Sequence, residues 1–363
     1  MTNFTVYNDK AINSKIEKDL EFIKTEVLNR FTGVKNLILT GGFGRGEGGV
    51  LLQDKKIIPV NDYDIVLITD KIQDSHKIQA MKKHLEKNLQ VTWVDIKNLT
   101  EKNLKKLKLS IFNYDLKYAS HVFYGNKEIV NLIPVMDAAN LPLIEGEILF
   151  LTRLYCFLGS FSTEFLKRAM TNEEKFFLSN QMSKTLLACM DVMLLLKGAY
   201  HPSYCKRLSN FKKKYPENND LYPLFEWALE FKVKPQKNTN KNLIDFYFEV
   251  KHIYFSIMKD FLSVRYRKKI QTWDTYARVY KWNFQKIVKR LGYLIFKQNL
   301  AFEKWHNISL AQLYIAASYQ QRGIEKNLFS RGLKYLGHAG NKKYPALSWE
   351  KARSLAAKLR MEI

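Results

Sequence analysis

The sequence contains few cysteines and no long apolar run. Its three cysteines, Cys156, Cys189 and Cys205, are too few for a disulfide framework and lack the spacing of zinc ligands. The most apolar stretch, residues 186–196, is too short to span a bilayer and carries Asp191 near its centre. The N-terminus has no apolar segment typical of a signal peptide. These absences predict a cytoplasmic protein without a transmembrane segment.

Acidic residues are fewer than basic ones, and they are fewest in the C-terminal part of the chain. The chain has 35 Asp and Glu residues against 59 Lys and Arg, which gives a formal net charge of +24. Residues 1–150 are almost balanced at +2, whereas residues 265–363 carry +16 with only five acidic residues. The apolar share of 46% is ordinary for a globular protein and excludes wholesale disorder. The charge therefore indicates a phosphate-bearing partner or an anionic surface and says nothing about the fold.

Glycine is concentrated in one place, because six of the nine residues 41–49 are glycines. They follow an apolar strand candidate at 36–40, and clustered backbone N–H groups suit phosphate oxygens. A Walker A loop is excluded because no lysine follows before Lys55. A dinucleotide fingerprint should open a helix, whereas residues 50–60 favour two short strands. The H-R-D and D-F-G signatures of kinases are absent.

Three carboxylates follow the glycines on segments that favour strands. Asp62 and Asp64 are two residues apart at the start of residues 62–69, so they share one face of that strand. The two carboxylates repel each other. The usual compensation is a hard cation that takes oxygen ligands, Mg²⁺ or Mn²⁺. Asp95 ends an apolar run in the next strand candidate, residues 91–96. If the strands are neighbours, three carboxylates converge, as phosphoryl transfer with two metal ions requires.

The order of these motifs resembles the DNA polymerase β-type nucleotidyltransferase superfamily. The resemblance rests on GGFGRGEGG at 41–49, NDYDIVL at 61–67 and VDI at 94–96, and it covers roughly residues 35–140. It implies an enzyme that moves a nucleoside monophosphate from a nucleoside triphosphate to an acceptor hydroxyl and releases pyrophosphate. It also implies Mg²⁺ or Mn²⁺ as the cofactor.

The resemblance assigns roles to individual residues. Asp62 and Asp64 are expected to bind both metal ions, and Asp95 to bind one and orient the attacking hydroxyl. The residues expected to hold the triphosphate are Gly41 and Gly42, with Arg45 nearby.

The periodicity of apolar residues predicts an α+β fold, with an N-terminal mixed-sheet domain followed by a mostly helical region. Helices are expected near 13–30 and 74–88, a further strand at 121–125, and no convincing strand after about 145. The expected domains are a catalytic domain at 1–140, a helical nucleotide- and acceptor-binding domain at 141–264, and a basic, aromatic-rich helical extension at 265–363.

Residues 179–204 are similar to the helical region of small-molecule and RNA-tailing nucleotidyltransferases. This similarity implies that Lys184 contacts the triphosphate and that Tyr200 or Tyr204 stacks on the base. The alternative interpretation is that Lys184 is an ordinary exposed lysine on a helix and that Tyr200 and Tyr204 are ordinary packed side chains. Asp191 fits a general base for the acceptor or a paired residue inside a helix bundle.

The acceptor and the basic C-terminal region stay open at this point. Residues 263–299 interleave Arg and Lys with aromatic residues, which fits RNA or another polyanion, an anionic lipid surface, or a solvated helix face. RNA or an oligonucleotide is the acceptor favoured by the charge, against an aminoglycoside- or sugar-type molecule or a protein. A non-catalytic binding module on the same scaffold is the remaining alternative.

Overall fold

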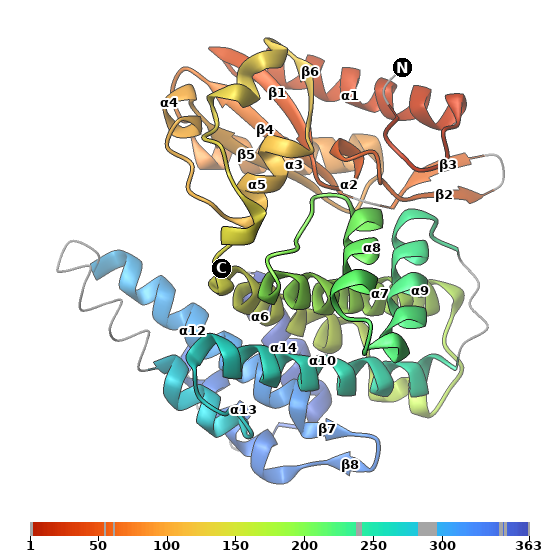
Figure 1. The fold of residues 1–363 in the computed structure, drawn as a ribbon, viewed down its shortest axis with the longest axis vertical. Helices are drawn as coiled ribbons and strands as arrows, with labels where there is room; N and C mark the ends of the chain where they lie inside the picture. Colours follow the sequence, from red (N-terminus) through yellow and green to blue (C-terminus); the bar gives the residue numbers. More distant parts are fainter. Residues whose placement is uncertain are drawn as a thin grey trace. The chain divides into compact units, whose positions relative to one another are not determined.

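The computed structural model describes residues 3–53, 56–60, 62–236, 242–281, 296–340, 344 and 347–361. It consists of two compact units, each built from two separate stretches of chain. The first unit joins Met1–Pro142 with Lys197–Gln236, and the second joins Leu143–Leu196 with Lys237–Ile363. The first contains the main sheet and the second is mostly helical, which confirms the predicted α+β class (Figure 1).

A four-stranded sheet with the order β5-β4-β1-β6 forms the centre of the first unit (Figure 1). Strand β1 is antiparallel to both β4 and β6, whereas β4 and β5 are parallel, so the sheet is mixed as the sequence predicts. The strands are β1 (Val34–Thr40), β4 (Tyr63–Thr69), β5 (Val94–Leu99) and β6 (His121–Tyr124).

Two apolar cores cover the two faces of this sheet, because successive side chains of a strand point to opposite sides. Leu39 and Ile65 belong to the core that includes helices α1 (Lys10–Arg30) and α3 (Ser75–Leu89). Val66 belongs to the opposite core, which includes Leu116 of α5. The side chains of Asp9 and Asp74 accept hydrogen bonds from the first backbone N–H groups of α1 and α3, which fixes where the two predicted helices begin.

The glycine-rich segment is not a plain loop. A short helix, α2 (Gly41–Gly44), starts directly after β1, and the hairpin of β2 (Val50–Gln53) and β3 (Lys56–Pro59) follows. The hairpin confirms the two strands expected at 50–60. The remaining elements of this half of the unit are α4 (Glu101–Leu104), α5 (Ile111–Tyr118) and the 3₁₀ helices Lys127–Leu132 and Ala138–Asn140.

Helices α8 (Tyr204–Lys214) and α9 (Tyr222–Val233) belong to the first unit, together with the 3₁₀ helix Asn219–Leu221. The sequence analysis assigns them to the helical domain predicted at 141–264, whereas the compact unit groups them with the sheet. The physical reason is a set of buried polar contacts between this stretch and the sheet half of the unit, described below. The three-domain division at 1–140, 141–264 and 265–363 stays a prediction.

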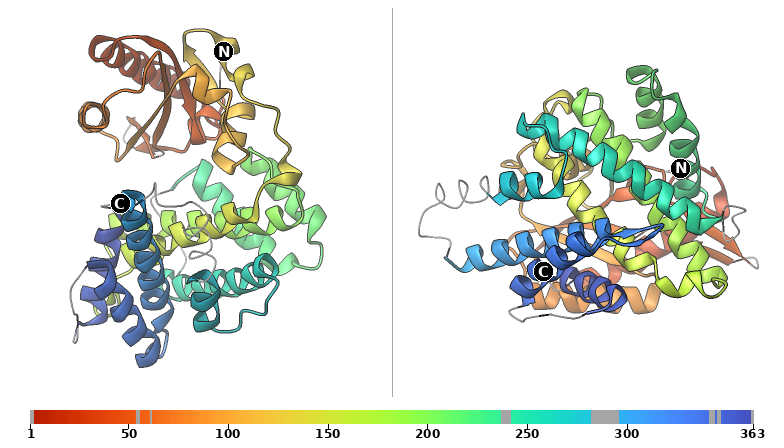
Figure 2. Two further views of the ribbon diagram at one scale, coloured as in Figure 1. Left: turned by 90° about the vertical axis from the view of Figure 1, so that its left-hand side faces the viewer. Right: turned by 90° about the horizontal axis from the view of Figure 1, so that it is seen from below.

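The second unit is a bundle of helices with an aromatic core. Helix α6 packs against α7 and α12, α10 packs against α7, and α12 packs against α13 and α14 (Figure 2). Their bounds are α6 (Leu143–Ser160), α7 (Asn172–Leu196), α10 (Leu243–Tyr266), α12 (Phe296–Ser318), α13 (Lys326–Gly340) and α14 (Trp349–Met361), with the 3₁₀ helix Thr163–Leu166. The two-residue strands β7 (Tyr319–Gln320) and β8 (Gly323–Ile324) are the exception to the prediction of no strand after 145.

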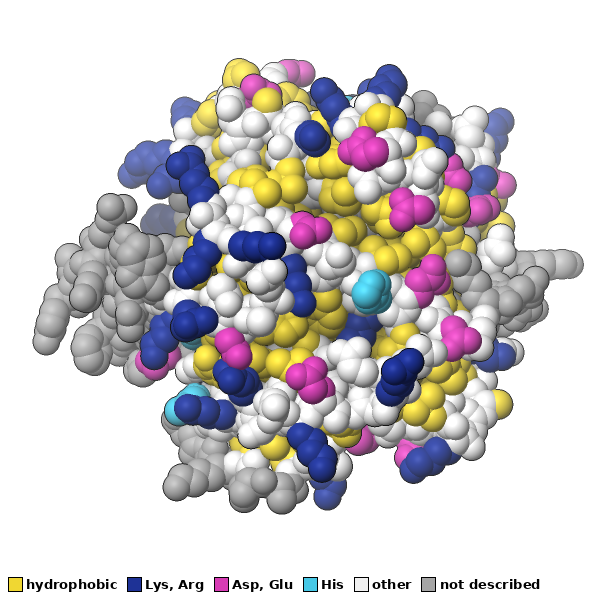
Figure 3. Space-filling model, turned by 60° about the horizontal axis from the view of Figure 1, so that its bottom comes forward, with side chains coloured by type: hydrophobic (Ala, Val, Ile, Leu, Met, Phe, Trp, Pro, Cys, Tyr) yellow, Lys and Arg dark blue, Asp and Glu magenta, His cyan; other side chains and the backbone are white. Residues whose placement is uncertain are grey.

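The basic C-terminal region is only partly described, since residues 282–295 of the segment 263–299 lie outside the described residues. On the face drawn in Figure 3, Lys and Arg side chains lie scattered among apolar and uncharged surface. Within the described part of the chain, no helix combines the length and apolarity needed to cross a membrane.

Candidate active site

The glycine segment and the first carboxylates meet at the end of β1. Thr40 pairs with Asp64 across the β1–β4 ladder, and its Oγ1 donates a hydrogen bond to the Asp64 backbone oxygen at 3.2 Å. Gly41 follows with a φ of +64°, and a Cβ on it would lie only 1.9 Å from Asp64 Oδ2. The Asp64 carboxylate therefore occupies the space that a side chain at position 41 would need, which explains why glycine stands here.

The parallel ladder between β4 and β5 brings the third carboxylate alongside. Asp64 and Asp95 are direct register partners in this ladder, so the two strands are neighbours, which is the condition for the three carboxylates to converge. Asp62 lies two residues before Asp64, at the entry to β4, and is partly buried, as Asp64 is. Asp95 is exposed. One end of the sheet thus carries all three predicted acids.

The electrostatics of Asp64 are unfavourable for a lone carboxylate. Burial, followed by the neighbouring charges of Asp62 and Asp95, raises its pKa to about 7, against smaller opposing effects of Lys232 and Arg45. A carboxylate in this position is stabilised by an added cation. Lys232, in the last turn of α9, is a basic residue that the sequence analysis missed, because nothing in the local sequence links α9 to β4.

The donor set fits a hard divalent cation in its chemistry, because it consists of carboxylate oxygens gathered where negative charge is uncompensated. Among the described residues, however, no group of three His, Cys, Asp or Glu side chains is arranged to hold a metal ion. Asp95 Oδ1 lies 2.7 Å from Nζ of Lys82 on α3, so an ammonium group already engages the third carboxylate.

Arg45 lies in a polar network rather than at the open end of the sheet. One of its terminal nitrogens lies 3.3 Å from Asp115 Oδ2, and its Nε lies 3.7 Å from Glu47 Oε2. Its guanidinium lies 4.9 Å from the centre of the Tyr204 ring, and only 8% of its side chain is exposed. These contacts hold the end of α2 in place, and a role of Arg45 at the triphosphate stays a prediction, as it does for Gly41 and the buried Gly42.

Asp115 of α5 connects this network to the segment before α8. Tyr200 donates its hydroxyl to the Asp115 carboxylate at 3.1 Å, and the buried Arg207 lies 3.4 Å from the same group. Arg207 also lies 4.3 Å from the ring centre of Tyr200, and Tyr200 itself is 3% exposed. Little of the Tyr200 side chain is therefore exposed, and its role in stacking on a base stays a prediction.

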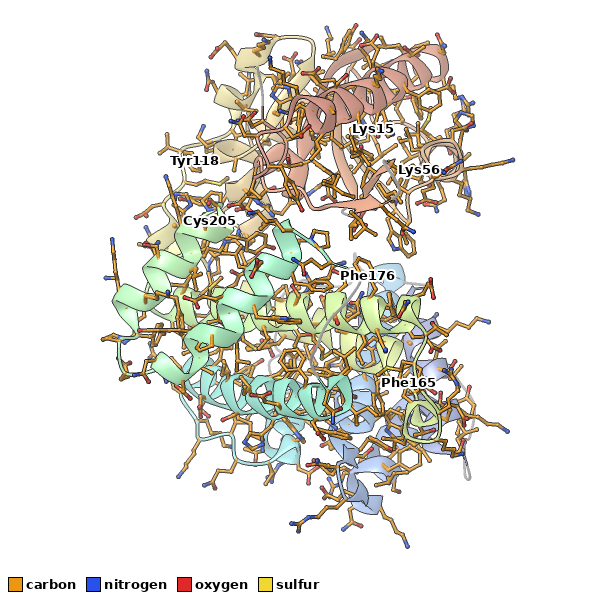
Figure 4. The ribbon with its side chains drawn as sticks, turned by 90° about the vertical axis from the view of Figure 1, so that its right-hand side faces the viewer. Lys15, Lys56, Tyr118, Phe165, Phe176 and Cys205 are labelled. Atoms are coloured by element: carbon orange, nitrogen blue, oxygen red, sulfur yellow. The ribbon has the colours of Figure 1, made fainter. Side chains whose placement is uncertain are left out.

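Glu47 is a buried carboxylate that the sequence analysis did not identify. It accepts hydrogen bonds from Ser203 Oγ at 2.7 Å, from the Tyr204 backbone N–H at 2.9 Å and from that of Cys205 at 3.2 Å. These donors form the first turn of α8, where Cys205 is labelled in Figure 4. Tyr204 is less buried than Tyr200, and its proposed role as a base platform stays a prediction.

Lys184 and Asp191 both lie on α7, in the second unit. Lys184 is partly exposed, whereas Asp191 is 6% exposed within an apolar stretch of the helix. The burial of Asp191 favours the bundle interior over an accessible general base. Contact of Lys184 with a triphosphate stays a prediction.

Comparisons with known proteins leave the family of the chain open. No protein-family model matches it, and no curated protein matches it. Among solved structures, it is similar to spectinomycin adenyltransferase AAD(9) from Enterococcus faecialis, crystallised with ATP and spectinomycin. The two are 9% identical with a TM-score of 0.38, over 69% of this chain and 100% of the other. At this similarity the function is argued from the carboxylates and the glycine turn alone.

Proposed function

We propose that this protein is a nucleotidyltransferase that moves a nucleoside monophosphate from a nucleoside triphosphate to an acceptor hydroxyl, with release of pyrophosphate. One observation supports this most directly: the Asp64 carboxylate packs against Gly41 while Asp95 is its register partner on the next strand. A glycine turn and paired acids at one end of the sheet place backbone N–H groups, which can bind phosphate, beside carboxylate oxygens.

In this proposal the triphosphate lies against Gly41 and Gly42. They are the first residues of α2, and the first N–H groups of a helix have no acceptor within that helix. The absence of a side chain at Gly41 lets the backbone approach both the ligand and Asp64.

The three acids divide the remaining work. Asp62, Asp64 and Asp95 would hold Mg²⁺ or Mn²⁺, which when bound offsets charge on the leaving pyrophosphate and favours ionisation of the acceptor hydroxyl. Asp95 is the most exposed of the three and would orient that hydroxyl. Asp64, partly buried against Gly41, would keep its carboxylate fixed in position.

The test is nucleotidyl transfer from each of the four α-³²P-labelled ribonucleoside triphosphates with Mg²⁺. Asp62→Asn and Asp64→Asn are expected to lower turnover by at least 100-fold, as removal of a charge-stabilising group does. Asp70→Asn is the matched control, since Asp70 follows the other end of β4 and pairs with Lys35 on the surface. Equal activity of wild type and Asp64→Asn, or no turnover with any nucleotide, would contradict the proposal.

For the acceptor we propose an RNA or oligonucleotide end, because residues 265–363 carry a net charge of +16. The same assay run with an RNA 3′ end, an aminoglycoside and a protein mixture separates this acceptor from a small molecule and from a protein. RNA binding that weakens steeply with salt supports the proposal, whereas RNA binding without any nucleotide turnover favours a non-catalytic module. Vesicles with anionic lipid test whether the same charge binds a membrane surface.

A further inference from the structure

We propose that Lys82 competes with the divalent cation for Asp95, so that the metal site is complete only after the ammonium group leaves this carboxylate. This inference rests on the proposed function, because it concerns the same three acids. It adds to the site a residue that neither the motifs nor the spacing of the acids includes.

The position of Lys82 follows from the packing of α3 against β5. Met81 and Leu85 of this helix are buried in the same core as Val94 and Ile96 of β5. Lys82 directly follows the buried Met81 and is itself partly buried. Strand β5 forms the edge of the sheet, and a lysine on the covering helix can reach around this edge to the opposite face.

The contact links two side chains of different exposure. The Lys82 side chain is 21% exposed and that of Asp95 is 68% exposed, with Nζ and Oδ1 2.7 Å apart. The backbone register already places Asp95 beside Asp64, yet the described residues contain no group of three metal-ligating side chains. Lys82 therefore supplies at Asp95 the positive charge that a metal ion would otherwise supply.

The expected size of the effect follows from the exposure of the pair. An exposed ion pair contributes little to stability, so a divalent cation can displace this ammonium at small cost. Removal of Lys82 is accordingly expected to tighten divalent binding by about two- to fivefold. The effect should disappear when Asp95 can no longer accept either cation.

The experiment measures Mn²⁺ binding to the full chain without nucleotide, by titration calorimetry and by the electron paramagnetic resonance signal of free Mn²⁺. The variants are Lys82→Met, Lys82→Arg and the neighbouring Lys83→Met as a matched control, because Lys83 is exposed on the same helix. Each is also made in the Asp95→Asn background, which gives a double-mutant cycle. Circular dichroism checks that every variant is folded.

Tighter Mn²⁺ binding by Lys82→Met, no change in Lys82→Arg or Lys83→Met, and no effect of Lys82→Met in the Asp95→Asn background would support the inference. Unchanged or weaker Mn²⁺ binding by Lys82→Met would overturn it, as would the absence of Mn²⁺ binding in all variants. The proposed function is judged separately, by nucleotidyl transfer with Mg²⁺ or EDTA. Transfer that depends on Mg²⁺ while Lys82→Met binds Mn²⁺ like wild type overturns the role of Lys82 alone.

Discussion

Gly41 shows how a single missing side chain can determine a site. It has a φ of +64°, and a Cβ there would meet Asp64 Oδ2 at 1.9 Å and Asp64 Cγ at 2.9 Å. Gly41→Ala is therefore expected to displace the Asp64 carboxylate and to lower the free energy of unfolding by roughly 1–3 kcal/mol, because alanine is strained at this φ. Urea unfolding gives the stability, and nucleotidyl transfer per folded molecule gives the activity.

Gly198→Ala is the matched control for this prediction. Gly198 has nearly the same φ, +60°, but an added Cβ would meet nothing closer than Ala139 Cα at 3.2 Å. This variant should lose stability through backbone strain and keep its turnover. If both variants keep full turnover, the close approach of Gly41 to Asp64 has no role in the reaction.

Lys251 is a buried lysine whose stability contribution should depend on pH. Burial lowers its pKa to about 7 from the ordinary 10.5, and its ammonium group donates to the Tyr319 backbone oxygen. Between pH 7 and 10.5 the unfolded chain binds more protons at this residue than the folded one, so stability should rise with pH across this window. Below about pH 7 both states are protonated and the cost of burial is largest.

Lys251→Met removes this titration. Relative to wild type, it should be most stabilising at pH 6, and its advantage should shrink by pH 9.5, as measured by melting temperature. The carbonyl of Tyr319 loses its donor in the variant, but this cost is independent of pH and does not change the slope. A melting-temperature difference that stays constant from pH 6 to 9.5 would contradict the lowered pKa.

The site acids could be predicted from the sequence because their signal is local. Two-residue spacing puts Asp62 and Asp64 on one face of a strand wherever that strand pairs. Lys82 and Glu47 carry no such signal. Lys82 pairs with an acid on the next strand by reaching around a sheet edge, and Glu47 bonds to Ser203, 156 residues away. The first contact depends on the position of β5 at the edge of the sheet, and the second on the re-entry of the chain into the first unit at Lys197. Neither can be deduced from the periodicity of apolar residues.

At the scale of elements, Glu47 anchors the start of α8. It accepts from one hydroxyl and two backbone N–H groups there, and it is 5% exposed. Glu47→Ala is expected to lower the free energy of unfolding by about 2–3 kcal/mol, because buried donors lose their acceptor and a helix N-terminus loses a negative charge. Urea unfolding followed by circular dichroism measures the loss.

Two variants complete this experiment. Glu47→Gln keeps the shape and one acceptor oxygen, so it should lose less than half as much as Glu47→Ala. Glu217→Ala controls for removal of an exposed glutamate in the same unit and should change stability by less than about 0.5 kcal/mol. A loss as small as this for Glu47→Ala would show that α8 does not depend on the anchor.

The elements themselves were largely predictable, and their grouping was not. The expected helices at 13–30 and 74–88 correspond to Lys10–Arg30 and Ser75–Leu89, and the expected strands correspond to β1, β4, β5 and β6. Apolar periodicity is a local pattern, so it can be recognised in a single sequence. The assignment of α8 and α9 depends on Asp115 and Glu47, whose partners no local pattern identifies.

At the scale of the whole molecule, the chain leaves the first unit after Pro142 and returns at Lys197. The contacts that tie the returning stretch are polar and buried: Tyr200 and Arg207 meet Asp115, while the start of α8 meets Glu47. Most of the excess positive charge lies elsewhere, in residues 265–363 of the second unit. Chemistry at the acids and charge at the C-terminal region therefore belong to different units.

This interleaving predicts that residues 1–142 do not form a complete folding unit. Without residues 197–236, Asp115 keeps Arg45 but loses Tyr200 and Arg207, and Glu47 loses its three donors at the start of α8. Each lost hydrogen bond to a buried group costs about 1–3 kcal/mol. Residues 1–142 joined by a Gly-Ser linker to 197–236 should unfold cooperatively in urea at a clearly higher midpoint than residues 1–142 alone. The joined protein carrying Glu47→Ala should fall between the two. Equal midpoints for the joined protein and for residues 1–142 would place the boundary near residue 140, as the sequence predicts.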